Sequence, residues 1–455
     1  MGSEEVKNFS PTLFFCLNFD NIVLMQGKIL NVAKNIHFIG IGGIGISAVA
    51  RMMLGEGKEV SGSDSVMSEI TKSLEKEGAK IFIGHNKDNF AEKIDLVIYT
   101  VAISKENPEF LEAQRKKIKT ITYAEALHEI SRDKFTIAVS GTHGKTTTTA
   151  MIAKVMMDAE RDPTVIVGSL LKDSQTNFIA GKSKYLVVEA CEYKRSFLNI
   201  EPTIAAITNI DNDHLDYYKD IADIQSAFNS FVKKVPKKGF VVCNPKDKNI
   251  LGTISEVNGK IVDWSKFKAD RLKMKVPGEH IKKDASVALA VAHILGIDKN
   301  KAIKSLEEFS GTWRRFEYKG KSKCGVEMYD DYGHHPTEIK ATLKSAREKF
   351  LQKRIVVVFQ PHLFSRTKLL LHDFARAFQD ADEIILAPIF PAREPFDPTI
   401  SSDILAKEIA KQDKKVFSLP NFSEIEKYLA DHLKKDDILI TMGAGEAYKI
   451  LDNLA

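Results

Sequence analysis

The sequence is poor in cysteine and has no cysteine pair at a metal-binding spacing. Its 455 residues include four cysteines, at positions 16, 191, 243 and 324, which lie far apart along the chain. This absence argues against a structural zinc site and favours reduced thiols, as in proteins of the cytoplasm. We therefore predict a cytoplasmic location.

A long hydrophobic run is also missing. The apolar segment near the N-terminus, PTLFFCLNFDNIVLM, is interrupted by Asn18, Asp20 and Asn21, and it is too short to span a bilayer. It has neither the basic leader nor the small-residue cleavage site of a signal peptide. We predict no membrane insertion, and we interpret residues 1–34 as an N-terminal extension outside the core.

Charge of one sign is not concentrated along the chain. The net charge is +5, from 66 Lys and Arg against 61 Asp and Glu, and its even spread does not suggest a nucleic-acid-binding surface. Apolar residues make up 44% of the chain, which supports ordinary globular cores, and the length suffices for about three domains. We therefore expect a globular protein with no nucleic-acid partner.

What the sequence does have is a repeated alternation of short apolar strands and amphipathic helices. The pattern starts at residue 35, restarts at KFTIAVSGTHGKTTTT and restarts again after GTWRRFE. SKYLVVEA is almost continuously apolar, as expected of a strand buried on both faces. This alternation predicts α/β folds with doubly wound parallel sheets.

The first Gly-rich turn, GIGGIG, follows a predicted strand and opens a predicted helix. It contains Gly40, Gly42, Gly43 and Gly45, and Asp64 ends the next strand. Glycines let the backbone approach a diphosphate, and a helix N-terminus offers amide donors. Alone, the turn indicates a site for a dinucleotide or a nucleotide diphosphate, with NAD as the default. The alternative is a tight turn that binds nothing.

A second Gly-rich turn, SGTHGKTTT, also joins a strand to a helix. It differs from the usual phosphate-binding loop G-x-x-x-x-G-K-[ST], because Gly141 stands only three residues before Gly144. Lys145 can nevertheless reach terminal phosphates, and the Thr146 hydroxyl can hold Mg²⁺. We predict a nucleotide site here, and a Gly turn with a surface Lys is the alternative.

Carboxylates and a histidine follow the next two predicted strands. Glu189 ends YLVVEA, where an unpartnered carboxylate would be costly, so a metal or a base is expected as its partner. A salt-bridged Glu at the rim of the sheet is the alternative. In TNIDNDHLDYY, His214 can ligate a second metal, or it can cap the loop through a hydrogen bond.

The third block carries two polar loops, YDDYGHHPTEI and FQPHLFSRT, each after a strand. Two carboxylates with Tyr332, His334 and His335 are too polar for a core turn, and Pro336 is favoured in the first turn of a helix. The fork of Arg366 matches a carboxylate bidentately. The two loops therefore predict a polar site at the carboxyl edge of the third sheet.

Taken in order, six segments resemble the Mur ligases: GTHGKTTT, EACEYKRSFL, TNIDNDHLDYY, GTWRRFE, DDYGHHPTEI and FQPHLFSRT. GTHGKTTT is found across that family. GIGGIG, DDYGHHPTE and FQPH are typical of its alanine-adding branch and of a relative that recycles murein tripeptide. The resemblance runs from Asn35 nearly to the C-terminus.

The resemblance implies three domains. These would be a Rossmann-like UDP-sugar-binding domain (35–131), a central ATP-binding domain with a P-loop ATPase-type mononucleotide-binding fold (132–316), and a Rossmann-like amino-acid-binding domain (317–455). The third would close over the cleft. We expect a monomer or a weak homodimer.

The resemblance also implies a reaction. An ATP-dependent, Mg²⁺-requiring amide ligase would join L-alanine to the lactyl carboxylate of UDP-N-acetylmuramate through an acyl phosphate, in the synthesis of the peptidoglycan precursor. The alternative is the recycling of a tripeptide onto the same UDP-sugar. Rivals from other classes are an NAD-dependent oxidoreductase, which leaves GTHGKTTT unexplained, and a catalytically idle nucleotide-binding regulator.

Single residues take the roles that the resemblance implies. The catalytic residues would be Lys145, His214, His334 and Arg366. ATP would contact Gly141, Thr142, His143, Gly144, Lys145, Thr146, Thr147, Arg315 and Asp331. The UDP-sugar and L-alanine would contact Gly40, Gly42, Gly43, Gly45, Asp64, Tyr332, His334 and Arg366. Mg²⁺ would be held by Thr146, Glu189 and His214.

One helix departs from the family pattern. Many members read G-x-H-N-x-x-N at the helix that faces adenine, whereas GEHIKKD has Ile281 and Asp284 at the two Asn positions. The resemblance therefore leaves open how adenine is held.

Overall fold

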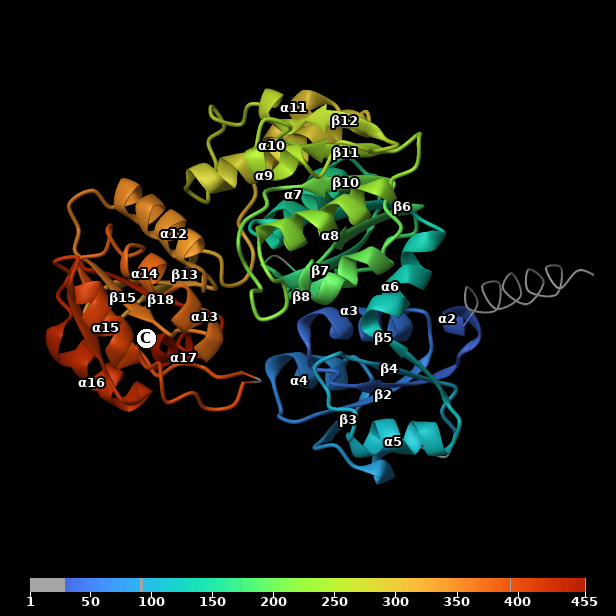
Figure 1. Cartoon of the computed structure of the whole chain (residues 1–455), viewed down its shortest axis with the longest axis horizontal. Coiled ribbons are helices and arrows are strands. Elements are labelled where there is room, and N and C mark those ends of the chain that lie inside the picture. Colours follow the sequence, from blue (N-terminus) through green and yellow to red (C-terminus); the bar gives the residue numbers. More distant parts are fainter. Residues whose placement is uncertain (1–28, 91–92, 173, 393, 455) are drawn as a thin grey trace, which may run out of the picture. The chain divides into compact units, whose positions relative to one another are not determined.

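The computed structural model describes residues 29–90, 93–172, 174–392 and 394–454. The chain forms two compact units, Met1–Lys134 and Phe135–Ala455, and its described residues build three β-sheets (Figure 1). Most of the predicted N-terminal extension, residues 1–28, lies outside the described residues, and the short helix α2 (Ile29–Val32) belongs to the end of that extension.

The first unit contains a parallel five-stranded sheet in the order β3-β2-β1-β4-β5. The strand order reverses between β1 and β4, and doubly wound sheets bind ligands at such a point. The Gly-rich turn follows β1, so it lies at this reversal. The elements are β1 (Asn35–Ile39), α3 (Ile44–Gly55), β2 (Glu59–Asp64), α4 (Glu69–Lys76), β3 (Lys80–Ile83), η1 (Lys87–Asn89), β4 (Leu96–Tyr99), α5 (Pro108–Arg115), β5 (Lys119–Thr122) and α6 (Tyr123–Arg132).

The second unit begins with a seven-stranded sheet in the order β12-β11-β10-β6-β9-β7-β8, in which only the β7–β8 pair is antiparallel. Helices α7 and α10 pack against each other and against this sheet, and their apolar side chains share one core with those of β6 and β9. The elements are β6 (Phe135–Ser140), α7 (Lys145–Asp158), β7 (Thr164–Leu171), β8 (Thr176–Ile179), β9 (Tyr185–Glu189), η2 (Tyr193–Asn199), β10 (Ile204–Ile207), α8 (Ile221–Lys233), β11 (Phe240–Cys243), α9 (Lys248–Leu251), β12 (Lys260–Asp263), η3 (Trp264–Lys266), α10 (Glu279–Ile294) and α11 (Lys299–Glu307).

The remainder of the second unit forms a six-stranded sheet in the order β13-β14-β18-β15-β16-β17, antiparallel only at the β13–β14 edge. Side chains of β15 alternate between the two faces, so Val357 and Phe359 enter one core whereas Val356 and Val358 enter the other. The elements are β13 (Glu317–Lys321), β14 (Glu327–Asp331), α12 (Pro336–Lys349), β15 (Ile355–Phe359), α13 (Phe364–Leu369), α14 (Leu371–Ala375), β16 (Glu383–Leu386), α15 (Ser402–Ala410), β17 (Lys415–Ser418), α16 (Phe422–His432), β18 (Ile438–Met442) and α17 (Lys449–Leu454).

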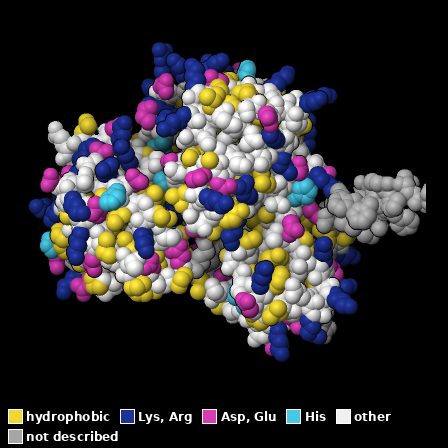
Figure 2. All heavy atoms as spheres, in the orientation of Figure 1, with side chains coloured by type: hydrophobic (Ala, Val, Ile, Leu, Met, Phe, Trp, Pro, Cys, Tyr) yellow, Lys and Arg dark blue, Asp and Glu magenta, His cyan; other side chains and the backbone are white. Residues whose placement is uncertain are grey.

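Acidic and basic side chains are mixed at the surface. Figure 2 shows Lys and Arg interspersed with Asp and Glu over the visible face. Within the described part of the chain, no helix combines the length and the apolar character that crossing a membrane requires.

Candidate active site

The phosphate-binding loop between β6 and α7 is tied to the end of β10. Gly141 and Gly144 have φ values of 140° and 80°, which favour glycine, and a Cβ on Gly141 would overlap Thr208. The Thr208 hydroxyl donates to the His143 carbonyl at 2.6 Å, and the His143 amide donates to Asn209 Oδ1 at 3.0 Å. The loop is short, but these contacts define its path into α7.

Lys145 folds back over this loop. Its Nζ donates to the carbonyls of Gly141 and Thr142, at 2.6 and 3.0 Å, and to the Glu192 carboxylate at 3.0 Å. Burial lowers the pKa of Lys145, but Glu192, Cys191 and Glu189 together raise it by more, so the side chain is a cation. It can exchange these partners for the oxygens of a bound phosphate.

The three predicted metal ligands lie around the same loop. Thr146 is buried at the second position of α7, and Glu189 Oε2 accepts the Gly168 amide at 2.8 Å. His214 Nε2 lies 3.7 Å from Glu192 Oε1, and its buried Nδ1 has no hydrogen-bond partner among the described residues. Hydroxyl and carboxylate oxygens suit Mg²⁺, whereas imidazole is a softer ligand. The set therefore fits magnesium best at Thr146 and Glu189.

A cavity of about 510 Å³ lies beside the loop, entirely within the second unit. This volume is in the range of small-molecule sites. Trp264, Ile281 and Asp284 belong to its wall, so the helix that the resemblance assigns to adenine does border the space. The cavity is also lined by five of the predicted ATP contacts, His143, Gly144, Thr147, Arg315 and Asp331.

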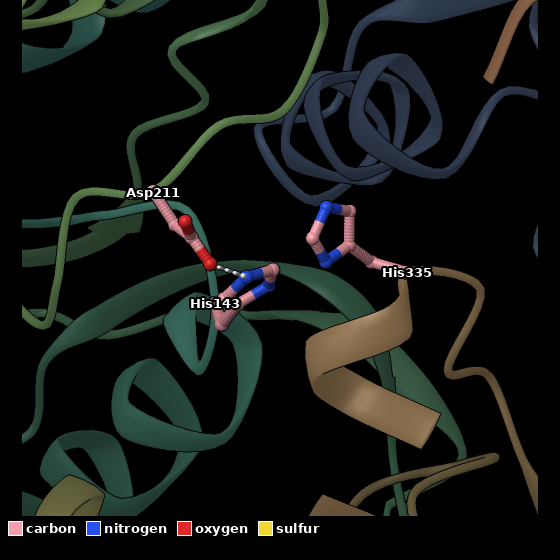
Figure 3. A group of neighbouring side chains, drawn as sticks. All are labelled: His143, Asp211 and His335. Carbon is pink, nitrogen blue, oxygen red and sulfur yellow. Dashed lines mark hydrogen bonds and ion pairs between the residues drawn. The ribbon is translucent and has the colours of Figure 1, made fainter. Parts of the chain in front are cut away.

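Figure 3 shows His143 from the phosphate-binding loop beside Asp211, with His335 facing them from the start of α12. His143 Nε2 lies 3.4 Å from Asp211 Oδ2, and the two imidazole rings are 4.9 Å apart. The three side chains are close enough to share a metal ion. However, His335 Nε2 donates to the Asn212 carbonyl at 3.0 Å, and its Nδ1 accepts the Thr337 amide at 3.3 Å. Both nitrogens of His335 are therefore engaged, and the cluster is better explained as a hydrogen-bonded link.

Glu338, in the first turn of α12, connects three of the predicted residues. Its carboxylate lies 3.6 Å from each of His143 Nδ1, Arg315 Nη1 and His334 Nδ1. Burial lowers the pKa of His143, but Asp211 and Glu338 raise it to about 9. Burial raises the pKa of Glu338, but these cationic and imidazole groups hold it well below its usual range. The phosphate-binding loop thus carries an imidazolium between two carboxylates.

The residues predicted to face the amino acid form a line of contacts. The rings of Tyr332 and His334 are 5.4 Å apart, and those of His334 and His362 are 5.6 Å apart. Arg366 is buried and donates from Nη1 to His362 Nδ1 and from Nη2 to Asp213 Oδ1, both at 3.0 Å. Burial lowers the pKa of His334 to about 4. Its imidazole is therefore neutral at neutral pH.

Asp331 and Arg315 lie where the second and third sheets meet. Asp331 ends β14 and accepts the amides of Gly333 and Phe316 at 2.7 and 2.8 Å. Burial raises the pKa of Asp331 to about 6. Arg315 lies with its Cζ 5.4 Å from the ring of Tyr332. Asp331 therefore shapes the turn that carries the amino-acid loop.

The Gly-rich turn of the first unit is organised by Asp64, whose Oδ2 accepts the Gly42 amide at 2.9 Å. Gly40 has a φ of 80°. A Cβ on Gly45 would lie 2.8 Å from the ring of Tyr123, the first residue of α6. Gly43 is the N-cap of α3, and the N-terminus of a helix carries a positive partial charge that favours an anion. The five predicted residues lie together at the carboxyl ends of β1 and β2.

Three family models match consecutive parts of the chain. Residues 35–135 match the Mur ligase family, catalytic domain, residues 139–287 match the Mur ligase middle domain, and residues 314–445 match the Mur ligase, glutamate ligase domain. The chain belongs to the Mur ligase family. The three matched segments follow the three sheets in chain order, with β6 (Phe135–Ser140) at the boundary between the first two segments. This confirms the predicted three-domain α/β architecture.

Individual Mur ligases resemble the chain over nearly its whole length. A UDP-N-acetylmuramate–L-alanine ligase of Clostridium kluyveri is 45% identical over 444 residues, which cover 92% of this chain and 97% of that protein. One from Clostridium tetani is 42% identical and covers 94% and 99%. The solved structure of UDP-N-acetylmuramate-alanine ligase from Thermotoga maritima has a TM-score of 0.78 at 29% identity, covering 92% of this chain and 98% of that one.

This Mur ligase site includes groups to which the sequence alone assigned no role. Glu192 lies three residues after Glu189 in the same motif, so a charged neighbour could have been suspected there. Glu338 stands at the third helical position after His335, where a capping-box pattern places an acidic side chain. The pairing of Asp213 with Arg366 joins residues 153 positions apart, so no local sequence pattern could predict it.

Proposed function

We propose that the protein is an ATP-dependent amide ligase that joins L-alanine to the lactyl carboxylate of UDP-N-acetylmuramate, in peptidoglycan precursor synthesis. The observation that carries the proposal is one loop, residues 211–213, which contacts both halves of the site. Asp211 lies beside His143 of the phosphate-binding loop, and Asp213 pairs with Arg366 of the amino-acid cluster. Relatives named as UDP-N-acetylmuramate–L-alanine ligases, 41–45% identical over most of the chain, support it.

The reaction requires activation of a poor electrophile. A carboxylate does not form an amide spontaneously in water, so the γ-phosphoryl group of ATP would convert it to an acyl phosphate, which the alanine amine attacks with release of phosphate. Several anions must then lie close together. Lys145, Arg315 and Mg²⁺ held by Thr146 and Glu189, with His214 at a second ion, would neutralise them.

The remaining residues would position the reactants. Gly141, Thr142, Gly144 and Thr147 would surround the phosphates with His143, and Asp331 would support the loop that faces L-alanine. Arg366 would hold the amino-acid carboxylate in a fork, beside Tyr332 and His334. The alanine ammonium group must lose a proton before its amine attacks, and a neutral His334 imidazole can accept a hydrogen bond from that amine and orient it.

The diphosphate of the UDP-sugar would bind at the first Gly-rich turn. The positive N-terminus of α3 at Gly43 suits an anion, and the missing side chains of Gly40, Gly42 and Gly45 let the backbone approach one closely. We assign residues 35–131 to the UDP-sugar, 132–316 to ATP and 317–455 to the amino acid. A cytoplasmic location and a monomer or weak homodimer remain predictions.

Phosphate release tests the proposal. Purified enzyme with ATP, Mg²⁺ and UDP-N-acetylmuramate should release phosphate when L-alanine is added, and the murein tripeptide should be a poor replacement. The variant Lys145→Ala should lose roughly a thousandfold in kcat, while Lys154→Ala, on the same helix α7, should not. Turnover with the tripeptide but not with L-alanine would instead identify the recycling ligase.

A further inference from the structure

The ion pair between Arg366 and Asp213 is enclosed by protein. The Arg366 side chain is 7% exposed and that of Asp213 is 9% exposed, with Nη2 and Oδ1 3.0 Å apart. A guanidinium removed from water to this degree needs an anionic partner. Asp213 supplies the carboxylate, and its Oδ1 also accepts the amide of His214 at 2.7 Å.

The space next to this ion pair is too small for an amino acid. The neighbouring cavity has a volume of about 10 Å³, and Asp213, His214, Ser365 and Arg366 line it. Such a volume holds about one water molecule. Asp213 occupies the Nη2 arm of the Arg366 fork, and His362 Nδ1 contacts the Nη1 arm. An amino-acid carboxylate can reach Nη2 only if the Asp213 carboxylate moves away.

We propose, on the basis of the proposed function, that Asp213 is a placeholder for the amino-acid substrate. Its carboxylate occupies the position on Arg366 that the carboxylate of L-alanine takes, and it leaves Arg366 when the amino acid binds. Asp213 is thus a residue that determines the affinity for the amino acid without belonging to the reacting atoms.

The Asp213 carboxylate has a second partner within reach once it leaves Arg366. Asp213 Oδ2 lies 3.9 Å from His214 Nε2, so a small rotation brings the carboxylate to the histidine that is a predicted metal ligand. The same loop is held by Thr337, which donates to Asp211 Oδ2 at 3.1 Å, and by His335, which donates to the Asn212 carbonyl at 3.0 Å. These contacts keep the loop in place while the Asp213 side chain changes partner.

The placeholder predicts an effect opposite to that of a structural ion pair. An occupied Arg366 lowers the apparent affinity for L-alanine in proportion to the fraction of molecules in which the fork is free. Removal of the competing charge therefore strengthens binding. A merely structural pair would, when broken, weaken the binding of all substrates and lower kcat.

The variant Asp213→Asn tests this difference, because Asn keeps the size and an acceptor oxygen for the His214 amide. We expect its KM for L-alanine to fall about tenfold, with the KM values for ATP and UDP-N-acetylmuramate unchanged. Calorimetric titration of L-alanine into the nucleotide-free variant should show the same gain over the wild type. Asp216→Asn is the matched control, since Asp216 lies in the same loop but accepts from the Tyr193 hydroxyl at 3.0 Å, and it should leave the KM for L-alanine unchanged.

An Asp213→Asn enzyme with an unchanged or raised KM for L-alanine would refute the placeholder. If this variant does not fold, Asp213→Glu is the second test. Its longer side chain keeps a carboxylate on Arg366, so the KM for L-alanine should not fall. A lowered KM for L-alanine in Asp213→Glu would overturn the proposal. A wild-type enzyme that turns over no amino acid at all would refute the proposed function and the placeholder together. If the wild type turns over L-alanine but Asp213→Asn does not change the KM for L-alanine, the placeholder alone is refuted.

Discussion

Asp284 shows how burial changes the chemistry of one side chain. It lies on α10 against Gly144 of the phosphate-binding loop. Burial raises the pKa of Asp284 well above its usual value, and Thr148, Arg315 and His143 offset this only in part. A protonated carboxyl group can donate and accept a hydrogen bond, as the amide of Asn does. The acid can therefore replace the Asn that the family pattern places here.

The variant Asp284→Asn should stabilise the protein more at pH 8 than at pH 5. A group whose pKa is raised by folding contributes stability that is complete below its unfolded pKa and is lost as the pH rises toward its folded pKa. Asn has no proton to lose, so we expect a gain of about 1 kcal/mol at pH 8, or about 2–4 °C in Tm by scanning calorimetry. A gain that is equal at both pH values would contradict this account.

At the scale of elements, the N-terminus of α12 links the phosphate-binding loop to the third sheet. His335 is the N-cap, Pro336 begins the helix, and Glu338 completes a capping box. The same Glu338 lies 3.6 Å from His143 Nδ1. One short sequence therefore both starts a helix and provides the counter-charge for a histidine of the phosphate-binding loop.

The imidazolium of His143 should make stability depend on pH. Its folded pKa of about 9 lies above the ordinary value of 6.5, so its contribution is complete below pH 6.5 and is lost as the pH rises through 9. The loss amounts to about 3 kcal/mol. Urea unfolding of the wild type at pH 6, 7.5 and 9 measures it.

A matched pair of variants separates His143 from other groups that titrate. His143→Gln should flatten the pH dependence over this range. His372→Gln should leave it unchanged, because the His372 side chain is 78% exposed at the protein surface. If both variants keep the slope of the wild type, the dependence arises elsewhere and the assignment to His143 is wrong.

At the scale of the whole molecule, the two compact units divide the proposed ligands. Phe135–Ala455 contains the phosphate-binding loop, the 510 Å³ cavity and the Arg366 cluster. Met1–Lys134 contains the Gly-rich turn at the sheet reversal. Under the proposed assignment, the sites for ATP and for the UDP-sugar would therefore belong to separate compact units.

A fragment comprising residues 135–455 should bind ATP but form no amide. At a Mg-ATP concentration of 100 times Kd, binding should add about 2.7 kcal/mol to its stability, seen as a rise in Tm that EDTA reduces. Lys145→Ala in the same fragment should abolish most of this rise. A folded fragment without a response to Mg-ATP would show that the first unit is needed for the nucleotide site.

The sequence by itself determined the α/β class, the two Gly-rich turns and the positions of most charged groups of the site. These follow from periodicity and from turn chemistry, which are local: glycine at φ values of 80° and 140°, a Pro at a helix start, and apolar strands such as SKYLVVEA. Only the tertiary structure decided which charges meet. The contacts of Lys145 with Glu192, of His143 with Glu338 and of Arg366 with Asp213 join separate elements. Burial then sets the pKa of these groups, because desolvation depends on packing around the whole site.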